Sequence, residues 1–126
     1  MNECTMTAVE HFENPRNRGR MPNPDGIGGI GDLSQGDFLR VFIRVENNII
    51  TDVKYEIRDC PTSIACASIM TQLVIGKDLD EAMMIENEDI VDALGGLPEE
   101  MLYCSNRAAT GLHEAIINHV YGRVRR

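Results

Sequence analysis

The sequence has no run of apolar residues long enough to cross a bilayer, which takes roughly 20 in succession. Its first residues, Met1–Cys4, also lack the basic and apolar regions of a signal peptide. These two absences predict a cytoplasmic protein that does not bind membranes. In a reducing cytosol, the four cysteines are expected to be thiols, ligands or nucleophiles and not a disulfide framework.

Basic residues are in short supply, because 12 Lys and Arg stand against 20 Asp and Glu and the net charge is -8. Proteins bind the phosphate backbone of nucleic acids through Lys and Arg, so this balance argues against a nucleic-acid partner. Arginines gather near the two ends, at 16–20 and at 123–126. A solvated surface explains these two groups more simply than a docking patch for an acidic protein.

Internal repeats and low-complexity tracts are absent, and 126 residues with 43% apolar content fit a single domain over 1–126. A short helix is expected over 7–12, ended by Pro15. Residues 16–36, rich in Gly, Pro, Asn and Asp, predict a long irregular loop. The glycine run at 26–31 resembles a nucleotide-binding loop only weakly, because no strand is expected before it and no helix after it.

Alternating apolar residues predict two strands, 39–46 and 51–58, which Asn47-Asn48 joins into an antiparallel hairpin. Helical patterns follow the hairpin. The residues expected to start or stop these helices are, in order, Pro61, Gly76, Asp78, Asn87 and Ser105. Strands first and helices afterwards predict an α+β fold, a small antiparallel sheet packed by several helices.

Two cysteines, Cys60 and Cys104, are placed where helices are expected to begin. A helix N-terminus stabilises an anion, so such a thiol is more readily deprotonated and becomes a better nucleophile and metal ligand. Asp37, just before the first predicted strand, is the nearest plausible carboxylate. Two thiolates and one carboxylate suit zinc or iron. The alternative is that both cysteines are merely small buried apolar residues.

Cys66 lies six residues beyond Cys60, which on a helix is about 9 Å of rise and roughly 240° of rotation, so the two sulfurs should diverge. Cys66 is therefore expected to pack inside the helix. The role of Cys4 stays open. The three histidines, at 11, 113 and 119, lack His-x-x-x-His spacing and are expected to be packed or solvated.

Five short motifs follow one another along the chain: His11–Asn17, Gly36–Asp37, Asp59–Cys60, Gly76–Ala82 and Cys104–Ser105. In this order and spacing they resemble the U-type iron-sulfur cluster assembly scaffolds, the family of IscU and of the N-terminal domain of NifU. The resemblance covers nearly the whole chain and implies the same α+β fold. It also implies a site of three cysteines, an aspartate and often a histidine, which binds a cluster or zinc and receives sulfur from a cysteine desulfurase.

Position by position, the resemblance assigns the aspartate to Asp37 and the second and third cysteines to Cys60 and Cys104. The first cysteine is replaced by Gln35 and the histidine by Tyr103. A neutral amide is a poor match for a site that prefers sulfur, and a phenol with a pKa near 10 does not normally bind metal at neutral pH. The sequence leaves open whether Cys4 or Cys66 substitutes for the missing cysteine.

The three remaining anionic ligands could hold one metal ion, whereas a two-iron cluster wants about four protein ligands, which two chains of a homodimer could supply together. The segment that such scaffolds present to an Hsp70-type chaperone corresponds to Leu97–Met101, which lacks the second proline and the lysine. Chaperone binding is therefore not expected. The implied partners are a cysteine desulfurase and apo iron-sulfur proteins as recipients.

The leading hypothesis is a scaffold-like carrier, not an enzyme, that binds metal or a labile cluster, or accepts persulfide sulfur, through Cys60, Cys104 and Asp37. Cys104 is expected to receive the sulfur, because the resemblance implies that it lies at the exposed edge of the site. Two alternatives stay open. One is an adaptor of the same fold without metal chemistry, and the other is a zinc-dependent sulfur acceptor or transferase.

Overall fold

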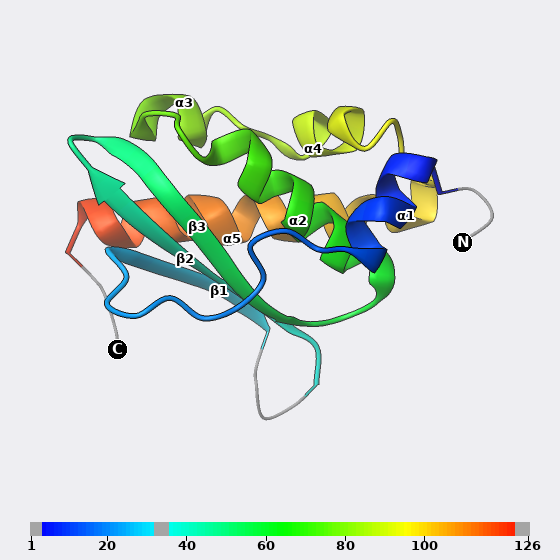
Figure 1. Cartoon of the computed structure of the whole chain (residues 1–126), viewed down its shortest axis with the longest axis horizontal. Coiled ribbons are helices and arrows are strands. Elements are labelled where there is room, and N and C mark those ends of the chain that lie inside the picture. The colour runs from blue at the N-terminus through cyan, green and yellow to red at the C-terminus, as the bar shows by residue number, and fades with distance from the viewer. Residues whose placement is uncertain (1–3, 32–35, 123–126) are drawn as a thin grey trace.

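The computed structural model describes residues 4–31 and 36–122, and within these ranges one short helix precedes three consecutive strands and the other helices follow them, which confirms the predicted α+β fold (Figure 1). In chain order the elements are α1 (Met6–Glu13), β1 (Gly26–Gly31), β2 (Phe38–Glu46), β3 (Ile49–Arg58), α2 (Pro61–Val74), α3 (Leu79–Met83), α4 (Asn87–Ala93), the 3-10 turn η1 (Glu99–Met101) and α5 (Leu102–Val120). Along the part of the chain described here, no helix has the length and apolar character that crossing a membrane would require.

The sheet has the strand order β1-β2-β3, and both pairs of neighbours are antiparallel. The predicted hairpin of β2 and β3 is confirmed. Its turn residues Asn47 and Asn48 have φ angles of 52° and 66°, the left-handed backbone that a tight hairpin turn requires and that asparagine tolerates. The alternation of apolar side chains then places one face of the hairpin in the core.

The prediction of one irregular loop over 16–36 is wrong for residues 26–31, which form the edge strand β1. Glycine is depleted in strands, so the pattern did not indicate one. The structure gives the reason for glycine here: a Cβ on Gly28 would lie 2.3 Å from the carbonyl oxygen of Gly111 in α5. The run of glycines therefore lets a helix pack directly on the backbone of a strand, and it is not a nucleotide-binding loop.

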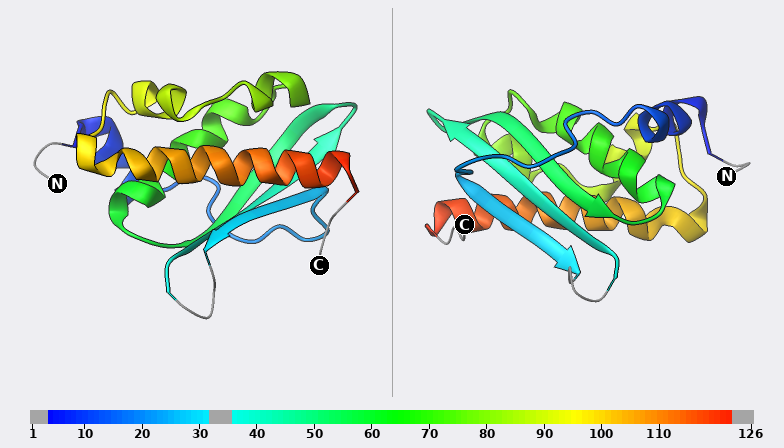
Figure 2. Two further views of the ribbon diagram at one scale, coloured as in Figure 1. Left: turned by 180° about the vertical axis from the view of Figure 1, so that it is seen from behind. Right: turned by 60° about the horizontal axis from the view of Figure 1, so that its bottom comes forward.

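The helices cover one face of the sheet, with α5 lying across β1 and β2 and α2 packed beside it (Figure 2). The core between these layers comes from the inner face of the hairpin and from the facing sides of α2 and α5. Its fully buried members include Val41, Ile43, Val53, Tyr55, Cys66, Met70, Ala115 and Leu112. This core fixes how α2 and α5 lie against each other.

Most of the predicted helix boundaries are confirmed, including Pro61 as the first residue of α2 and Asp78 as the cap of α3. The cap of α4 is Glu86 and not Asn87. The Glu86 backbone N–H donates to Oδ2 of Asp89 over 2.9 Å, so a glutamate supplies the capping box one residue earlier than expected. α2 and α5 begin at the same end of the molecule (Figure 1).

Candidate functional site

Cys60 is the residue that caps the start of α2, as the sequence predicts. Its backbone is extended, with φ -70° and ψ 163°, and Pro61 follows as the first helical residue. The Cys60 backbone N–H donates to Oδ1 of Asp59 over 2.7 Å, which holds the turn from β3 into the helix. The thiol therefore projects from a fixed point just outside the first turn of α2.

Cys104 lies inside the first turn of α5, not before it. The predicted cap at Ser105 is wrong, because η1 runs directly into a helix that already begins at Leu102. The Ser105 hydroxyl instead donates to the carbonyl oxygen of Leu102 over 2.8 Å. Cys104 is only 1% exposed, so the expectation that it lies at the exposed edge of the site is also wrong.

The two thiols meet across the interface of α2 and α5, and their Sγ atoms are 3.9 Å apart. Cys60 is partly exposed, whereas Cys104 is buried behind it. Two hydroxyl groups lie beside the Cys60 sulfur: Ser63 Oγ at 3.6 Å and Tyr103 Oη at 3.9 Å. The structure thus brings together two of the three residues that the sequence assigned to the site.

An ion pair that the sequence analysis missed ties the two cysteine-bearing segments together. Arg107 of α5 donates from Nη1 to Oδ2 of Asp59 over 2.7 Å, and the Asp59 side chain is only 5% exposed. Asp59 therefore accepts from the Cys60 backbone with one oxygen and from Arg107 with the other. Nothing in the sequence marks this pair, because the two residues are 48 positions apart and show only opposite charge.

The surroundings of the two thiols shift their pKa values in opposite directions. Burial acts to raise the pKa of Cys60, but hydrogen bonds from the backbone and hydroxyl of Ser63, from Tyr103 and from Cys104 outweigh it, so the pKa is lowered. Burial raises the pKa of Cys104 to about 11, and the neighbouring Cys60 charge adds to that rise. Cys60 is thus the thiol that ionises first.

Tyr103, which replaces the histidine of the resemblance, projects beside Cys60 with 48% of its surface exposed. Its interactions with Cys104 and then with Cys60 raise the pKa of its phenol above the usual value of 10. The phenol therefore stays protonated at neutral pH and can donate a hydrogen bond to a thiolate. In this form it is a poor metal ligand.

Asp37 lies just before β2 with an exposed side chain. Gln35, the other predicted position on this loop, falls outside the described residues. Within residues 4–31 and 36–122, no three His, Cys, Asp or Glu side chains gather closely enough to hold a metal ion. Asp37 as a ligand beside the two cysteines therefore stays a prediction.

The other two cysteines do not join the pair. Cys66 is fully buried in α2, as predicted, and burial raises the pKa of its thiol well above the usual range. Cys4 is half-buried and packs against the core next to α1. Within residues 4–31 and 36–122, no third cysteine joins Cys60 and Cys104 in a group that could hold a metal ion.

Each histidine has a structural partner, in line with the packed or solvated roles that the sequence indicates. His11 is 4% exposed and its Nδ1 lies 2.7 Å from Ser68 Oγ. His113 donates from Nε2 to the carbonyl oxygen of Ile85 over 2.6 Å. His119 bonds the carbonyl oxygen of Asp25 over 3.0 Å and so ties the end of α5 to the start of β1.

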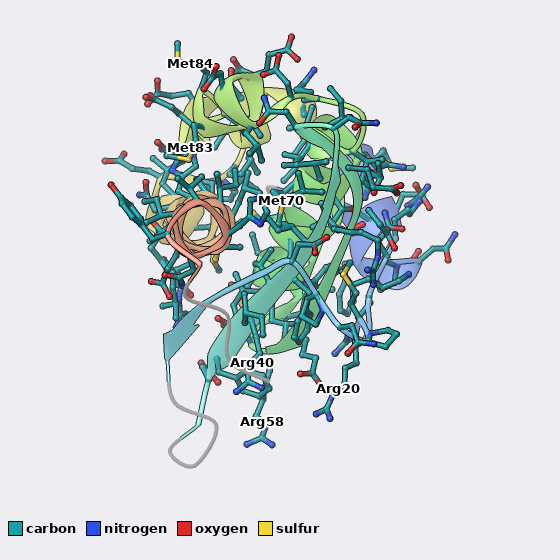
Figure 3. The ribbon with its side chains drawn as sticks, turned by 90° about the vertical axis from the view of Figure 1, so that its left-hand side faces the viewer. Arg20, Arg40, Arg58, Met70, Met83 and Met84 are labelled. Carbon is teal, nitrogen blue, oxygen red and sulfur yellow. The ribbon has the colours of Figure 1, made fainter. Side chains whose placement is uncertain are left out.

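Arg20, from the first group of arginines, lies near Arg40 and Arg58 of the sheet. Figure 3 shows Arg20, Arg40 and Arg58 projecting on the same side of the molecule. Arg20 and Arg40 flank Glu56 at 3.1 Å and 3.9 Å, and Arg58 lies 5.6 Å from the ring centre of Phe38. A pocket of about 230 Å³ opens between Arg20 and Arg40. The second group of arginines, 123–126, lies outside the described residues.

Comparisons with known proteins point to one family. The model of the NifU-like N terminal domain matches residues 3–125 of the chain. The iron-sulfur cluster assembly scaffold protein IscU 1 of Archaeoglobus fulgidus is 39% identical over 110 residues, which cover 87% of this chain and 72% of that protein. The iron-sulfur cluster assembly scaffold protein IscU of Aquifex aeolicus is 37% identical over 126 residues, covering 97% of this chain and 80% of that one.

A solved structure shows the same fold. The N-terminal part of a nitrogen-fixing NifU-like protein from Brucella abortus superimposes with a TM-score of 0.64 over 94% of this chain and 92% of that chain, at 21% sequence identity. At this sequence identity the similarity supports the fold alone, which is a small sheet with helices covering one face.

Proposed function

Because the chain belongs to the NifU-like N-terminal domain family, we propose that it is an iron-sulfur cluster assembly scaffold, a carrier that holds iron or a labile cluster and accepts sulfur at Cys60 and Cys104. Relatives that match most of the chain at 37–39% identity carry the name of such scaffolds. The iron and the cluster are cargo, which the chain holds and passes to apo iron-sulfur proteins. A cysteine desulfurase is the proposed source of sulfur.

The separation of the two sulfurs carries the proposal. Thiolates bound to one tetrahedral ion at about 2.3 Å lie about 3.8 Å apart, because the angle between two ligands is near 109°. The Sγ atoms of Cys60 and Cys104 are 3.9 Å apart. The pair therefore has the spacing of two ligands on one zinc or iron ion.

The rest of the coordination shell explains why the cargo would be labile. Asp37 is the proposed third ligand, and Gln35 and Tyr103 contribute a neutral amide and a protonated phenol. Water or sulfide would complete the shell of a single ion. A two-iron cluster is normally bound by about four protein ligands, so we propose that a stable cluster forms between the Cys60–Cys104 pairs of two chains.

Anaerobic reconstitution with iron and sulfide tests this function. The protein is expected to acquire the visible absorption of thiolate-to-iron charge transfer and to elute as a dimer when a cluster is present. Cys60→Ser and Cys104→Ser should each abolish this absorption, while Cys4→Ser, a control outside the pair, should leave it unchanged. A wild-type protein that stays colourless would contradict the cluster function.

A second candidate is a zinc-dependent sulfur acceptor. It is favoured by the finding that only two thiols meet in the described part of the chain, which is enough for sulfur exchange but poor for a resident cluster. A cysteine desulfurase assay with the zinc-loaded protein should then show a faster rate, and an unchanged rate would count against it. An adaptor without metal chemistry would bind the desulfurase yet contain no metal when freshly purified.

A further inference from the structure

The two thiols of the pair differ in access as well as in position. Cys60 caps α2 from an extended backbone and is partly exposed, so a donor molecule can reach its sulfur. Cys104 is 1% exposed in the first turn of α5, and its sulfur lies 3.9 Å from that of Cys60. An exposed thiol in contact with a buried one is the arrangement that suits a two-step exchange of sulfur.

We propose that Cys60 takes sulfur from a persulfide donor and that Cys104 then resolves the Cys60 persulfide, which releases hydrosulfide and leaves a Cys60–Cys104 disulfide. This inference rests on the proposed function, because it assumes that the site accepts persulfide sulfur. It reverses the expected order of the two cysteines and gives the chain an activity of its own, the release of one sulfide per reduced pair, for which the two thiols supply the electrons.

The first step is a transfer of one sulfur atom. The Cys60 thiolate attacks the outer sulfur of a donor persulfide, a new S–S bond forms on Cys60, and the donor leaves as its thiolate. No electrons are gained or lost overall. In this step the attacking sulfur must line up with the S–S bond of a donor molecule in solvent. Cys60 is partly exposed, so its sulfur can do so.

The second step follows from the contact between the two sulfurs. The Cys104 thiol gives its proton to the outer sulfur of the Cys60 persulfide, and the Cys104 sulfur attacks Sγ of Cys60, the inner sulfur. A new Cys60–Cys104 S–S bond forms, and the electron pair of the broken S–S bond leaves on the outer sulfur as hydrosulfide. The two Sγ atoms begin 3.9 Å apart and must close to about 2.05 Å, a movement of about 1.9 Å that rotation of the Cys60 side chain can largely supply.

Cys60 can make this movement because it precedes the helix, whereas Cys104 is held within α5. A thiol reductant such as glutathione must afterwards reduce the disulfide before another cycle. Since the disulfide removes both thiolates, releasing sulfide and holding metal are alternative states of the same pair. Bound zinc or iron should therefore suppress the second step.

The test uses the full chain, reduced and freed of metal with a chelator, and mixes it anaerobically with glutathione persulfide. Released sulfide is measured by methylene blue, and intact-mass and peptide-mass spectra record added sulfur and the disulfide. Wild type should release about one sulfide per chain above the donor-only background and form the Cys60–Cys104 disulfide. Cys104→Ser should trap one extra sulfur on Cys60 and release none, and Cys104→Ala serves if the serine variant does not fold.

Cys60→Ser should take up sulfur about tenfold or more slowly than wild type, because the buried Cys104 reacts only when the helix end opens. Cys4→Ser should match wild type. A stable persulfide on Cys60 in wild type, with no sulfide release, would overturn resolution by Cys104 and leave the scaffold function standing. Equal uptake by Cys60→Ser would overturn the order of the two cysteines. If the wild-type protein took up no sulfur, this inference would be overturned but the scaffold function would stand. The scaffold function is tested separately, by reconstitution with iron and sulfide.

Discussion

Replacing Arg107 by glutamine should destabilise the protein and loosen the cysteine pair together. Arg107 is the partner of Asp59, whose side chain is 5% exposed and which also holds the Cys60 backbone N–H. The glutamine variant keeps most of the aliphatic stem but removes the charge that balances the buried carboxylate. The expected loss therefore reports the ion pair and not a cavity.

The size of the loss follows from the geometry. Leaving one charge of a buried pair without its partner costs about 3–5 kcal/mol, and a charge-assisted hydrogen bond contributes about 1.5–3 kcal/mol. The Arg107 side chain is 27% exposed, so water can take over part of its role, and Asp59 keeps its bond to Cys60. We expect Arg107→Gln to lower the free energy of unfolding by about 2–3 kcal/mol.

Urea unfolding followed by circular dichroism measures this change, with Arg20→Gln as the matched control. Arg20 pairs with Glu56 over 3.1 Å, but the Arg20 side chain is 76% exposed. Arg20→Gln should therefore lower the free energy of unfolding by no more than about 0.5 kcal/mol. Asp59→Asn combined with Arg107→Gln should be less damaging than Arg107→Gln alone, because no buried charge is then left. Arg107→Gln should also slow formation of the Cys60–Cys104 disulfide.

An Arg107→Gln variant that lost no more stability than Arg20→Gln would contradict a stabilising role for the Asp59–Arg107 pair. That role would also be contradicted if the double variant were as unstable as the sum of its single changes, since that result would show no coupling between Asp59 and Arg107.

Three further predictions follow from the packing and the pKa shifts. Burial lowers the pKa of His11 below 6.5, so His11 binds a proton more readily in the unfolded chain than in the folded one. The free energy of unfolding should therefore fall as the pH drops below about 6.5. Urea unfolding at several pH values should show a weaker pH dependence for His11→Gln. Gly28→Ala should cost about 3 kcal/mol or more, since its Cβ would meet a carbonyl oxygen of α5 at 2.3 Å, whereas Gly29→Ala, with its nearest neighbour at 3.2 Å, should cost clearly less in the same assay. Iodoacetamide at neutral pH should alkylate Cys60 well before Cys104, and equal rates in peptide-mass analysis would contradict the difference in exposure and pKa.

The sequence predicts those elements that local patterns specify. The Asn47-Asn48 hairpin and the Pro61 start of α2 are confirmed because turn and capping residues act within a few positions of themselves. β1 escaped prediction because its cause is remote: the glycines of 26–31 make room for α5, which comes some 80 residues later. No local pattern carries that information.

In the site, too, local features could be predicted from the sequence and features that depend on tertiary packing could not. Cys60 was correctly placed at a helix start, while Cys104 turned out to be buried within α5, because η1 begins the helix earlier than the serine cap suggested. The meeting of the two sulfurs and the Asp59–Arg107 pair depend on how α2 packs against α5, which is a tertiary property. The assignment of Asp37 stays a prediction.

The central claim is that Cys60 and Cys104 form one metal-binding pair, and metal content per chain tests it most directly. Elemental analysis after anaerobic loading with iron or zinc should find bound metal in wild type and in Cys4→Ser. It should find little in Cys60→Ser and little in Cys104→Ser, because either change leaves a single thiolate. If both serine variants bound as much metal as wild type, the pair would not be the site.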